Sequence, residues 1–338
     1  MGKLKRKKPS KRTKTAKKTA PAKKPADFFE SKDFLSLKEF HPGNFEFLFK
    51  LAERMKKDPA AFSSRLRGKS LAMLFQMPSI RTRVSFQVGM SELGGSSVYV
   101  DPQESPLGER ESAKDIARVL SRYCDAVVLR AYHHSQIQEF ARAAAVPVIN
   151  GLSNSFHPCQ TLADLFTIRE KFRTLAKMNI AYIGDGNNVL HSLLYGAAKV
   201  GANLAIATPR GYEPNEEVLK DIKLISKESG SKVTLSNNPF TAIKNAHAVY
   251  TDVWVSMGQE KQREQRLRDF QPFQVNGAIM GKAPKDAMIL HCLPAHRGEE
   301  ITEDVIDHPR SAIFDQAENR LHTQKALLVL LMTRKKKK

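Results

Sequence analysis

Residues 74–86 read LFQMPSIRTRVSF, a stretch that contains an apolar strand end, a turn and the start of a helix. Pro78 ends the strand that we predict at residues 70–75, and Ser79 is a good N-cap for the helix that follows. The amides of the first helical turn are then unpaired donors that favour an anion, and Arg81 adds a guanidinium that can hold two phosphate oxygens. The stretch predicts a phosphate site, although in isolation a solvated helix start with two surface arginines fits it equally well.

Three further polar clusters follow apolar strands in the same way. His157-Pro158-Cys159-Gln160 follows residues 146–150, the stretch DVWVSMG at 252–258 follows residues 246–251, and His291-Cys292-Leu293-Pro294 follows residues 287–290. In an open α/β sheet, ligand groups collect at the carboxyl ends of the strands. We therefore expect the four clusters to face one cleft, which favours the phosphate site over the simple helix start.

Strands and helices alternate along the chain. The apolar pattern predicts strands at residues 70–75, 96–100, 126–129, 146–150, 179–183, 204–208, 232–236, 248–251, 288–290 and 312–314. It predicts helices at 31–61 with a break at Pro42-Gly43, from 83 onward, and at 112–123, 136–144, 161–174 and 319–332. This order indicates an α/β fold with parallel sheets covered by helices on both faces. The helix at 161–174 is long enough to bridge two such units.

The composition describes a nearly neutral body with basic ends. The chain has 338 residues, 41% of them hydrophobic, and contains no apolar run long enough to span a bilayer. Its net charge is +20, but residues 1–25 hold twelve Lys or Arg and no acid, and residues 334–338 hold five more. The remaining 38 basic residues face 35 acidic ones. The charge therefore does not by itself indicate a nucleic-acid-binding domain.

The two ends are predicted to be tails. Residues 1–32 are a predicted disordered basic tail, because a segment rich in Lys, Pro, Ala and Thr cannot offset its ordering entropy. Such tails bind polyanions non-specifically, although a solubilising extension is the simpler interpretation. A mitochondrial transit peptide is a third interpretation, opposed by the excess of Lys over Arg and by the lack of an amphipathic face. Three widely spaced cysteines, Cys124, Cys159 and Cys292, fit a reducing cytosol, so we expect a cytoplasmic protein without a membrane partner.

Over residues 33–333 the chain resembles the ornithine carbamoyltransferases. The S-x-R-T-R turn, H-P-x-Q and Arg320 are similar to the carbamoyl phosphate site that aspartate and ornithine carbamoyltransferases share. Asp252-x-x-x-Ser256-Met257-Gly258 and the H-C-L-P sequence resemble the ornithine branch. The resemblance implies transfer of a carbamoyl group from carbamoyl phosphate to the δ-amine of L-ornithine, which gives L-citrulline and phosphate in arginine metabolism. It implies no cofactor and a homotrimer, or a multiple of trimers.

The resemblance also implies a division into domains. Two doubly wound parallel-sheet domains would be joined by two interdomain helices. Residues 33–160 would form the carbamoyl phosphate-binding domain, completed by a C-terminal helix at 319–333 that crosses back to it. Residues 161–318 would form the ornithine-binding domain, and the basic tails at 1–32 and 334–338 would flank the enzyme.

The family's roles fall on named positions of this sequence. For carbamoyl phosphate the resemblance implies Ser79, Ile80 through its backbone amide, Arg81, Thr82, Arg130, His157, Gln160, Cys292, Leu293 and Arg320. Ser79, Arg81 and Thr82 would hold the phosphate, and Arg130 and His157 would stabilise the developing oxyanion. Gln160 and the carbonyls of Cys292 and Leu293 would accept from the carbamoyl amide.

For ornithine the resemblance implies a second set of residues, Asn188, Asp252, Ser256 and Met257. Asp252 and Ser256 would bracket the α-amino group, and Asn188 would hold the α-carboxylate side. Asp252 and Cys292 are similar to the residues placed nearest the proton of the reacting amine. Catalytic roles would therefore fall on Asp252, Cys292, His157 and Arg130.

The sequence departs from the family pattern in the phosphate turn. The commonest family loop reads F-E-K-P-S-T-R-T-R, and this chain has Gln76, Met77 and Ile80 at the Glu, Lys and first Thr positions. These changes bear on affinity for carbamoyl phosphate and not on the type of reaction. In related enzymes the loop at 104–111 reaches a neighbouring subunit, which makes Arg110 a candidate.

Several alternatives remain open on the sequence. Residues 183–189 read IGDGNNV after a strand and look like a dinucleotide fingerprint that lacks its third glycine, so an NAD(P) oxidoreductase is the second enzyme class. The acceptor could also be putrescine, acetylornithine or, less favoured, aspartate. A protein that binds polyanions through its tails is the non-enzyme alternative. No metal site is predicted, because His133-His134 and His291 with His296 lack a Cys or carboxylate set at ligand spacing.

Overall fold

The computed structural model describes residues 2, 31–101, 111–256 and 258–334. The prediction of a disordered tail therefore lies almost wholly outside the described residues, as do Met257, Arg110 and residues 335–338. Among the described residues, no helix combines the length and apolarity that crossing a bilayer requires.

The first domain is built on a parallel sheet with the strand order β2-β1-β3-β4. Its strands are β1 (Ser70–Phe75), β2 (Ser96–Val100), β3 (Ala126–Arg130) and β4 (Val148–Leu152). Its helices are α1 (Pro42–Lys57), α2 (Ile80–Glu92), α3 (Ala113–Tyr123) and α4 (His134–Ala143), with a 3-10 turn at Ala60–Phe62. Alternate residues of β1 enter different cores, because successive side chains of a strand point to opposite faces. Leu71 and Met73 pack with α1 and α2, whereas Ala72 and Leu74 pack with α3 and α4.

The second domain has a parallel sheet with the order β7-β6-β5-β8-β9. Its strands are β5 (Asn179–Ile183), β6 (Asn203–Ala207), β7 (Val233–Ser236), β8 (Ala248–Thr251) and β9 (Met288–His291). Its helices are α6 (Asn188–Lys199), α7 (Glu216–Ser229), α8 (Pro239–Ile243), α9 (Arg263–Phe270), α10 (Gly277–Met280) and α11 (Glu303–Ile306), with 3-10 turns at Glu260–Gln262 and Gln271–Phe273. The prediction of two doubly wound parallel-sheet domains is confirmed.

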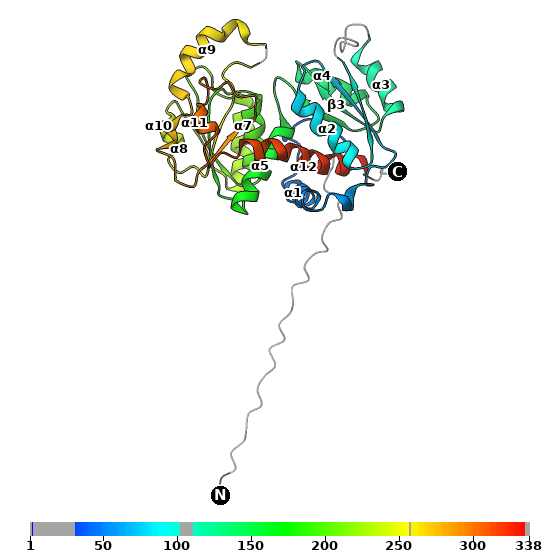
Figure 1. The fold of residues 1–338 in the computed structure, drawn as a ribbon, viewed down its shortest axis with the longest axis horizontal. Coiled ribbons are helices and arrows are strands. Elements are labelled where there is room, and N and C mark those ends of the chain that lie inside the picture. Colours follow the sequence, from blue (N-terminus) through cyan, green and yellow to red (C-terminus); the bar gives the residue numbers. More distant parts are fainter. Residues whose placement is uncertain (1, 3–30, 102–110, 257, 335–338) are drawn as a thin grey trace.

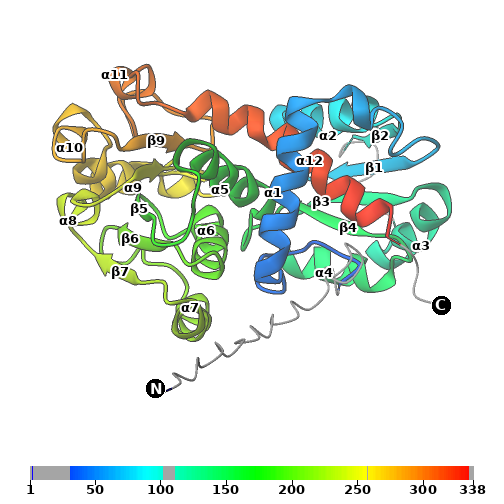
Figure 2. The same ribbon diagram turned by 90° about the horizontal axis from the view of Figure 1, so that it is seen from below.

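Two buried helices connect the domains. The first is α5 (Pro158–Phe172), and the second is α12 (Ile313–Met332), which starts beside β9 and ends against α1 and α2 of the first domain (Figures 1 and 2). Most residues of these helices are buried, because the two helices pack against each other and against the domains that they join. One continuous apolar core therefore runs beneath both sheets.

Two predicted elements were wrong. Residues 312–314 are not a strand, because only Ser311 bridges to Ile289 before α12 begins at Ile313. Residues 31–41 are not helical, because Phe34 runs parallel to β4 and exchanges backbone hydrogen bonds with Val148 and Asn150. The Pro-Gly pair at 42–43 is the start of a helix and not a break within one. Proline is favoured in a first turn, where its missing N–H would have no helical partner.

The strand orders determine where a ligand can bind. In each sheet the order reverses at one point, between β1 and β3 in the first domain and between β5 and β8 in the second. A crevice opens outside the carboxyl ends of the strands at such a point. The chain segments that follow β1, β3, β4, β5, β8 and β9 all meet at the cavity between the domains.

Candidate active site

A cavity of about 820 Å³ lies between the domains. Most of the residues predicted for the site line it, namely Ser79, Arg81, Thr82, Arg130, His157, Asn188, Asp252, Ser256, Cys292, Leu293 and Arg320. Two predicted residues do not. Ile80, which is 73% exposed, is not among the lining residues, and Gln160 is buried behind Arg320.

The side of the cavity formed by α2, the end of β3 and α12 carries the guanidiniums of Arg81, Arg130 and Arg320, and we call this side the positive end. Ser79 caps α2 by accepting from the Thr82 amide at 3.3 Å. Arg130 and Arg320 each donate to Oγ1 of Thr82 at 3.2 Å. Burial and the neighbouring guanidiniums of Arg320 and Arg81 lower the pKa of Arg130 to about 9, and burial also lowers the pKa of Arg320. Among the described residues, none of these three arginines is paired with a carboxylate. Clustered cations without counter-charges create a site for an anion.

Met77 contributes packing at this end where the commonest family loop has a lysine. Its side chain is buried at the cavity wall, and its carbonyl accepts from Nε of Arg130 at 3.2 Å. The backbone of the turn therefore orients one of the guanidiniums.

His157 lies at the start of α5 and is neutral at neutral pH. Burial lowers its pKa well below the usual value, and the positive charges of Arg320, Arg130 and Arg81 lower it further. Its backbone amide donates to Oγ of Ser192 at 2.7 Å, which ties the start of α5 to α6. A neutral imidazole here can donate one hydrogen bond to a carbonyl oxygen without adding a fourth positive charge.

Gln160 reaches the cavity only through Arg320. Its Oε1 accepts from Nη1 of Arg320 at 2.7 Å, and its Nε2 donates to Oδ1 of Asp164 at 2.8 Å. The predicted contact between Gln160 and a carbamoyl amide would compete with Arg320 for the same oxygen. Asp164, four residues further along α5, was not predicted as a site residue.

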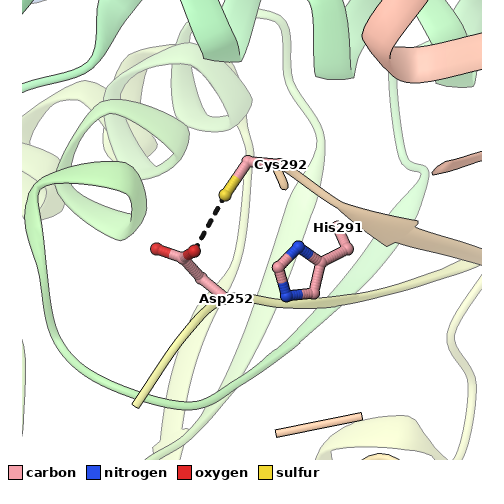
Figure 3. A group of neighbouring side chains, drawn as sticks. All are labelled: Asp252, His291 and Cys292. Carbon is pink, nitrogen blue, oxygen red and sulfur yellow. Dashed lines mark hydrogen bonds between the residues drawn. The ribbon is translucent and has the colours of Figure 1, made fainter. Parts of the chain in front are cut away.

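Asp252 and Cys292 lie side by side at the cavity wall (Figure 3), and the Asp252 carboxylate gives the second-domain side a negative group; we call this side the negative end. Asp252 follows β8 and Cys292 follows β9, and Sγ of Cys292 donates to Oδ1 of Asp252 at 2.9 Å. Burial raises the pKa of the Cys292 thiol well above its usual value, and the Asp252 charge raises it further. The cysteine is therefore a protonated donor, and its partner is a buried carboxylate that faces the cavity.

Asn187 completes the Asp252 environment and was missed by the sequence analysis. Its Nδ2 donates to Oδ2 of Asp252 at 2.8 Å, while its Oδ1 caps α6 by accepting from the amides of Val189 and Leu190. The signal was present, because asparagine directly before a helical pattern is a preferred N-cap. The predicted Asn188 also lines the cavity, and its Nδ2 donates to the Ser153 carbonyl at 2.6 Å.

The glycine-rich stretch after β5 is not a dinucleotide loop. A Cβ on Gly186 would lie 2.4 Å from the backbone of Glu213, so this glycine permits contact with protein and not with a pyrophosphate. Asp185 pairs with Arg266 at 3.0 Å, and burial raises the pKa of Asp185 to about 6. Arg266 also donates to the Trp254 carbonyl at 2.8 Å and thereby connects α9 to the segment that holds Ser256.

His291 shapes the turn that carries Cys292. Its Nδ1 accepts from the Leu293 amide at 2.8 Å, so Nε2 carries the proton and donates to Glu300 at 3.1 Å. Leu293 has a φ of 57° and precedes a cis proline. The turn directs Leu293 and Cys292 to the cavity wall.

Within the described part of the chain, two groups of side chains have ligand atoms close enough to share a metal ion. The potential ligand atoms of Asp252, His291 and Cys292 lie within 4.8 Å of one another, as do those of His296, Glu299 and Glu300. Spacing along the sequence had not indicated these carboxylates. Both ring nitrogens of His291 are already hydrogen-bonded, as is the Cys292 thiol. The absence of a metal requirement stays a prediction.

Comparisons with known proteins agree with this architecture. Residues 32–170 match the family model described as aspartate/ornithine carbamoyltransferase, carbamoyl-P binding domain, and residues 176–331 match the corresponding Asp/Orn binding domain. The chain is 51% identical over 296 residues to an ornithine carbamoyltransferase of Anoxybacillus flavithermus, covering 87% of this chain and 94% of the relative. It is 54% identical over 267 residues to an anabolic ornithine carbamoyltransferase of Pyrococcus furiosus, covering 79% of this chain and 85% of the relative.

Solved structures show the same relationship. The ornithine carbamoyltransferase structure from Pyrococcus furiosus superposes with a TM-score of 0.87 at 49% identity, covering 90% of this chain and 98% of that one. The anabolic enzyme from Campylobacter jejuni superposes with a TM-score of 0.86 at 38% identity, covering 90% and 100%. The chain therefore belongs to the aspartate/ornithine carbamoyltransferase family, and within it to the ornithine carbamoyltransferases.

Proposed function

We propose that this chain transfers the carbamoyl group of carbamoyl phosphate to the δ-amine of L-ornithine, giving L-citrulline and phosphate in arginine metabolism. The names of its relatives support the substrate pair, and one of them is called anabolic. The observation that carries the proposal is the distribution of charged side chains around the cavity. Three guanidiniums without carboxylate partners among the described residues lie at one end, and the Asp252 carboxylate lies at the other.

The positive end fits carbamoyl phosphate. Arg81, with Ser79, Thr82 and the first-turn amides of α2, including that of Ile80, would hold the phosphate. Arg130 and neutral His157 would donate to the carbonyl oxygen, which becomes an oxyanion in the tetrahedral intermediate. Arg320 adds charge, Gln160 fixes Arg320, and the carbonyls of Cys292 and Leu293 would accept from the carbamoyl amide. These contacts strengthen as negative charge develops, which is the requirement for catalysis.

The negative end fits the amino acid. Asp252 and Ser256 would bind the α-ammonium group, and Asn188 the α-carboxylate side; Met257 belongs to the same proposal but lies outside the described residues. The neutral δ-amine nitrogen would attack the carbamoyl carbon, and the C–O bond to phosphate would then break. The phosphate would depart with the electron pair of the C–O bond and would take the proton from the attacking nitrogen, which would lie near Cys292 and Asp252. Because a closed cavity lowers an amine pKa, no strong base is required.

The domain assignment follows from the same proposal. Residues 33–160 with the helix at 319–333 would form the carbamoyl phosphate-binding domain, and residues 161–318 the ornithine-binding domain. Carbamoyl phosphate would bind first and favour closure of the second domain over ornithine.

The substrate proposal is tested by an assay of carbamoylated product. Purified protein is given carbamoyl phosphate with L-ornithine, putrescine, acetylornithine or L-aspartate at equal concentrations. We expect citrulline with ornithine and a value of kcat/KM at least about a hundredfold above that for each other amine. Preference for any of the other three would reject ornithine as the substrate while leaving carbamoyl transfer intact.

The same proposal includes a cytoplasmic homotrimer, or a multiple of trimers. An apolar stripe supports association, because Ile80, Val84 and Val88 are exposed at every fourth position of α2, and Val98 is exposed on β2, the strand that packs with α2. Light scattering after gel filtration should give a mass that is a multiple of three 37.9 kDa chains. Val84→Glu should lower that mass, whereas a monomeric unaltered protein would reject the trimer.

A further inference from the structure

A continuous path of hydrogen bonds joins the two ends of the cavity through the protein interior. It begins at Thr82, where Nη2 of Arg320 donates at 3.2 Å, and continues from Nη1 of Arg320 to Oε1 of Gln160 at 2.7 Å. Nε2 of Gln160 then donates to Oδ1 of Asp164 at 2.8 Å. These members lie on α2, α12 and α5, around the positive end of the cavity.

The path continues from Asp164 to the negative end. Nε2 of Gln316 donates to the same Asp164 oxygen at 2.6 Å, and Oε1 of Gln316 accepts from the His291 amide at 2.9 Å. His291 is followed directly by Cys292, whose thiol holds Asp252. Gln160, Asp164, Gln316 and His291 are all buried, so water does not compete for these contacts.

Asp164 fixes the orientation of the two glutamine amides in the path. A glutamine side chain can present either its oxygen or its NH₂ group to a neighbour, and Oδ1 of Asp164, which accepts from both glutamines, pairs only with NH₂. Asp164 therefore turns both amides so that their oxygens face outward, one to Arg320 and the other to the His291 amide. Without Asp164 either amide could rotate, and Arg320 or the backbone before Cys292 would lose its acceptor.

We propose that Asp164 is a positioning residue through which carbamoyl phosphate at the positive end strengthens amino-acid binding at the negative end. This inference rests on the proposed function. A ligand that draws Arg320 toward its phosphate pulls on Gln160, and Asp164 passes the displacement to Gln316 and to the backbone of β9. Coupling of this kind is a free energy shared by two sites, so it is measurable as a ratio of affinities.

The test measures that ratio directly. L-norvaline has the amino-acid end of ornithine and no δ-amine, so it binds without reacting. Its dissociation constant is measured by calorimetry on the whole protein with and without saturating carbamoyl phosphate, and the quotient is the coupling factor. Allosteric coupling commonly amounts to about 5- to 150-fold. We expect the unaltered protein to lie in this range.

Three variants separate positioning from stability. Asp164→Ala removes the acceptor for both amides, and Gln316→Met cuts the path on the side away from the phosphate. Each should lower the coupling factor by about fivefold or more, with a smaller change in norvaline affinity when carbamoyl phosphate is absent. Asp164→Asn keeps an acceptor oxygen and should restore most of the coupling. If Asp164→Ala does not fold, Gln316→Met alone decides.

A matched control lies one turn further along the same helix pair. Thr167 on α5 is buried, and its Oγ1 accepts from Asn319 of α12 at 2.9 Å, but it is not part of the path. Thr167→Val should leave the coupling factor unchanged even if it lowers stability. An unchanged factor in Gln316→Met, or an equal fall in Thr167→Val, would overturn the role of Asp164. Failure of the unaltered protein to form citrulline would overturn the proposed function, and this inference with it.

Discussion

The Cys292 thiol donates its proton to the Asp252 carboxylate across 2.9 Å. Burial and the Asp252 charge both raise the pKa of Cys292, so the pair consists of a neutral thiol and an anion. With Asn187 holding the second carboxylate oxygen, Asp252 is fixed on two sides and presents its charge to the cavity. This arrangement suits Asp252 as an anchor for a cation, with the Cys292 thiol as a hydrogen-bond donor to it.

The sharpest prediction concerns amine specificity. Asp252→Asn keeps the size and one acceptor but removes the charge that would pair with the α-ammonium of ornithine. Putrescine lacks that group at that position and presents the same terminal amine to the carbamoyl carbon. Loss of a partner for a buried charge costs roughly 3 to 5 kcal/mol, so kcat/KM for ornithine should fall by about two to four orders of magnitude. The kcat/KM for putrescine should fall far less. Equal falls in kcat/KM for the two amines would mean that Asp252 serves the reacting amine or the fold.

The same pair predicts how Cys292 reacts with alkylating reagents. The thiolate is the reactive form, so a raised pKa slows alkylation. At pH 8, iodoacetamide should modify Cys292 more than about tenfold slower than free glutathione, since each pKa unit changes the thiolate fraction about tenfold. Asp252→Asn removes a charge that raises the pKa and should speed the reaction. Cys292→Ala gives the background from Cys124 and Cys159, and an unchanged rate in Asp252→Asn would contradict the assigned cause.

Arg81 is predicted to bind the phosphate, and Arg83 provides its control. Arg81 lines the cavity, whereas the Arg83 guanidinium lies 4.0 Å from the centre of the Tyr99 ring and does not line the cavity. Arg81→Ala should cost roughly 2 to 5 kcal/mol of transition-state stabilisation, measured as kcat/KM for carbamoyl phosphate. Arg83→Ala should cost less than about 1 kcal/mol. Near-normal kinetics in Arg81→Ala would mean that the S-x-R-T-R turn only caps α2 and does not bind phosphate.

Asp164 should make stability depend on pH. Burial raises its pKa to about 7 from the ordinary 3.8, against the lowering effects of Gln316, Gln160, Tyr250 and the Arg320 charge. The folded state therefore binds this proton more tightly than the unfolded state between about pH 4 and pH 7, and stability falls as the pH rises through that window. Relative to Asp164→Asn, the unaltered protein should lose up to about 1.4 kcal/mol of unfolding free energy per pH unit there. Urea titrations at pH 5 and pH 8 measure the unfolding free energy of both proteins. An equal change in unfolding free energy between the two pH values for both proteins would contradict the raised pKa of Asp164.

The tails should be separable from catalysis. Residues 1–25 contain twelve basic residues and no acid, and residues 334–338 contain five more, whereas the body is nearly neutral. Removing residues 1–26 and 334–338 should leave turnover unchanged and should abolish retention on heparin at low salt. A truncated protein without activity would show that the tails belong to the enzyme.

The sequence predicted the fold where local chemistry and tertiary contacts agree. Each apolar strand that ends in a polar cluster was identified, because a buried parallel strand has a recognisable composition and a helix start has a recognisable cap. The strand predicted at residues 312–314 was wrong because local chemistry and tertiary contacts disagree there. Ala312 bonds to Ile289 like a strand residue, yet packing against β9 and α5 makes the next residue the start of a long helix.

Within the site, sequence reasoning found the residues that follow strands and missed those that support them. Asp164 and Asn187 act on neighbours that are 152 and 65 residues away in the sequence, and Glu300 acts on His291 across a turn. Each lies where a helix cap or a solvated face is the ordinary expectation. Gln160 was predicted to face the ligand, because no local signal reveals that Arg320, 160 residues later, takes its oxygen. Such partnerships are set by the crossing of α5 and α12, which no local pattern reveals.

The position of α12 near the C-terminus determines when the first domain can complete its folding during translation. This helix supplies Arg320 to the positive end of the cavity and packs against α1, α2 and α5, all of which leave the ribosome earlier. Domains generally fold from the N-terminus while the rest of the chain is being translated. The apolar surface of the first domain that α12 covers therefore stays exposed until more than 150 further residues have been added after α5. A nascent chain paused before α12 would be a substrate for chaperones and would have no complete anion site, so activity can begin only after translation has passed this helix.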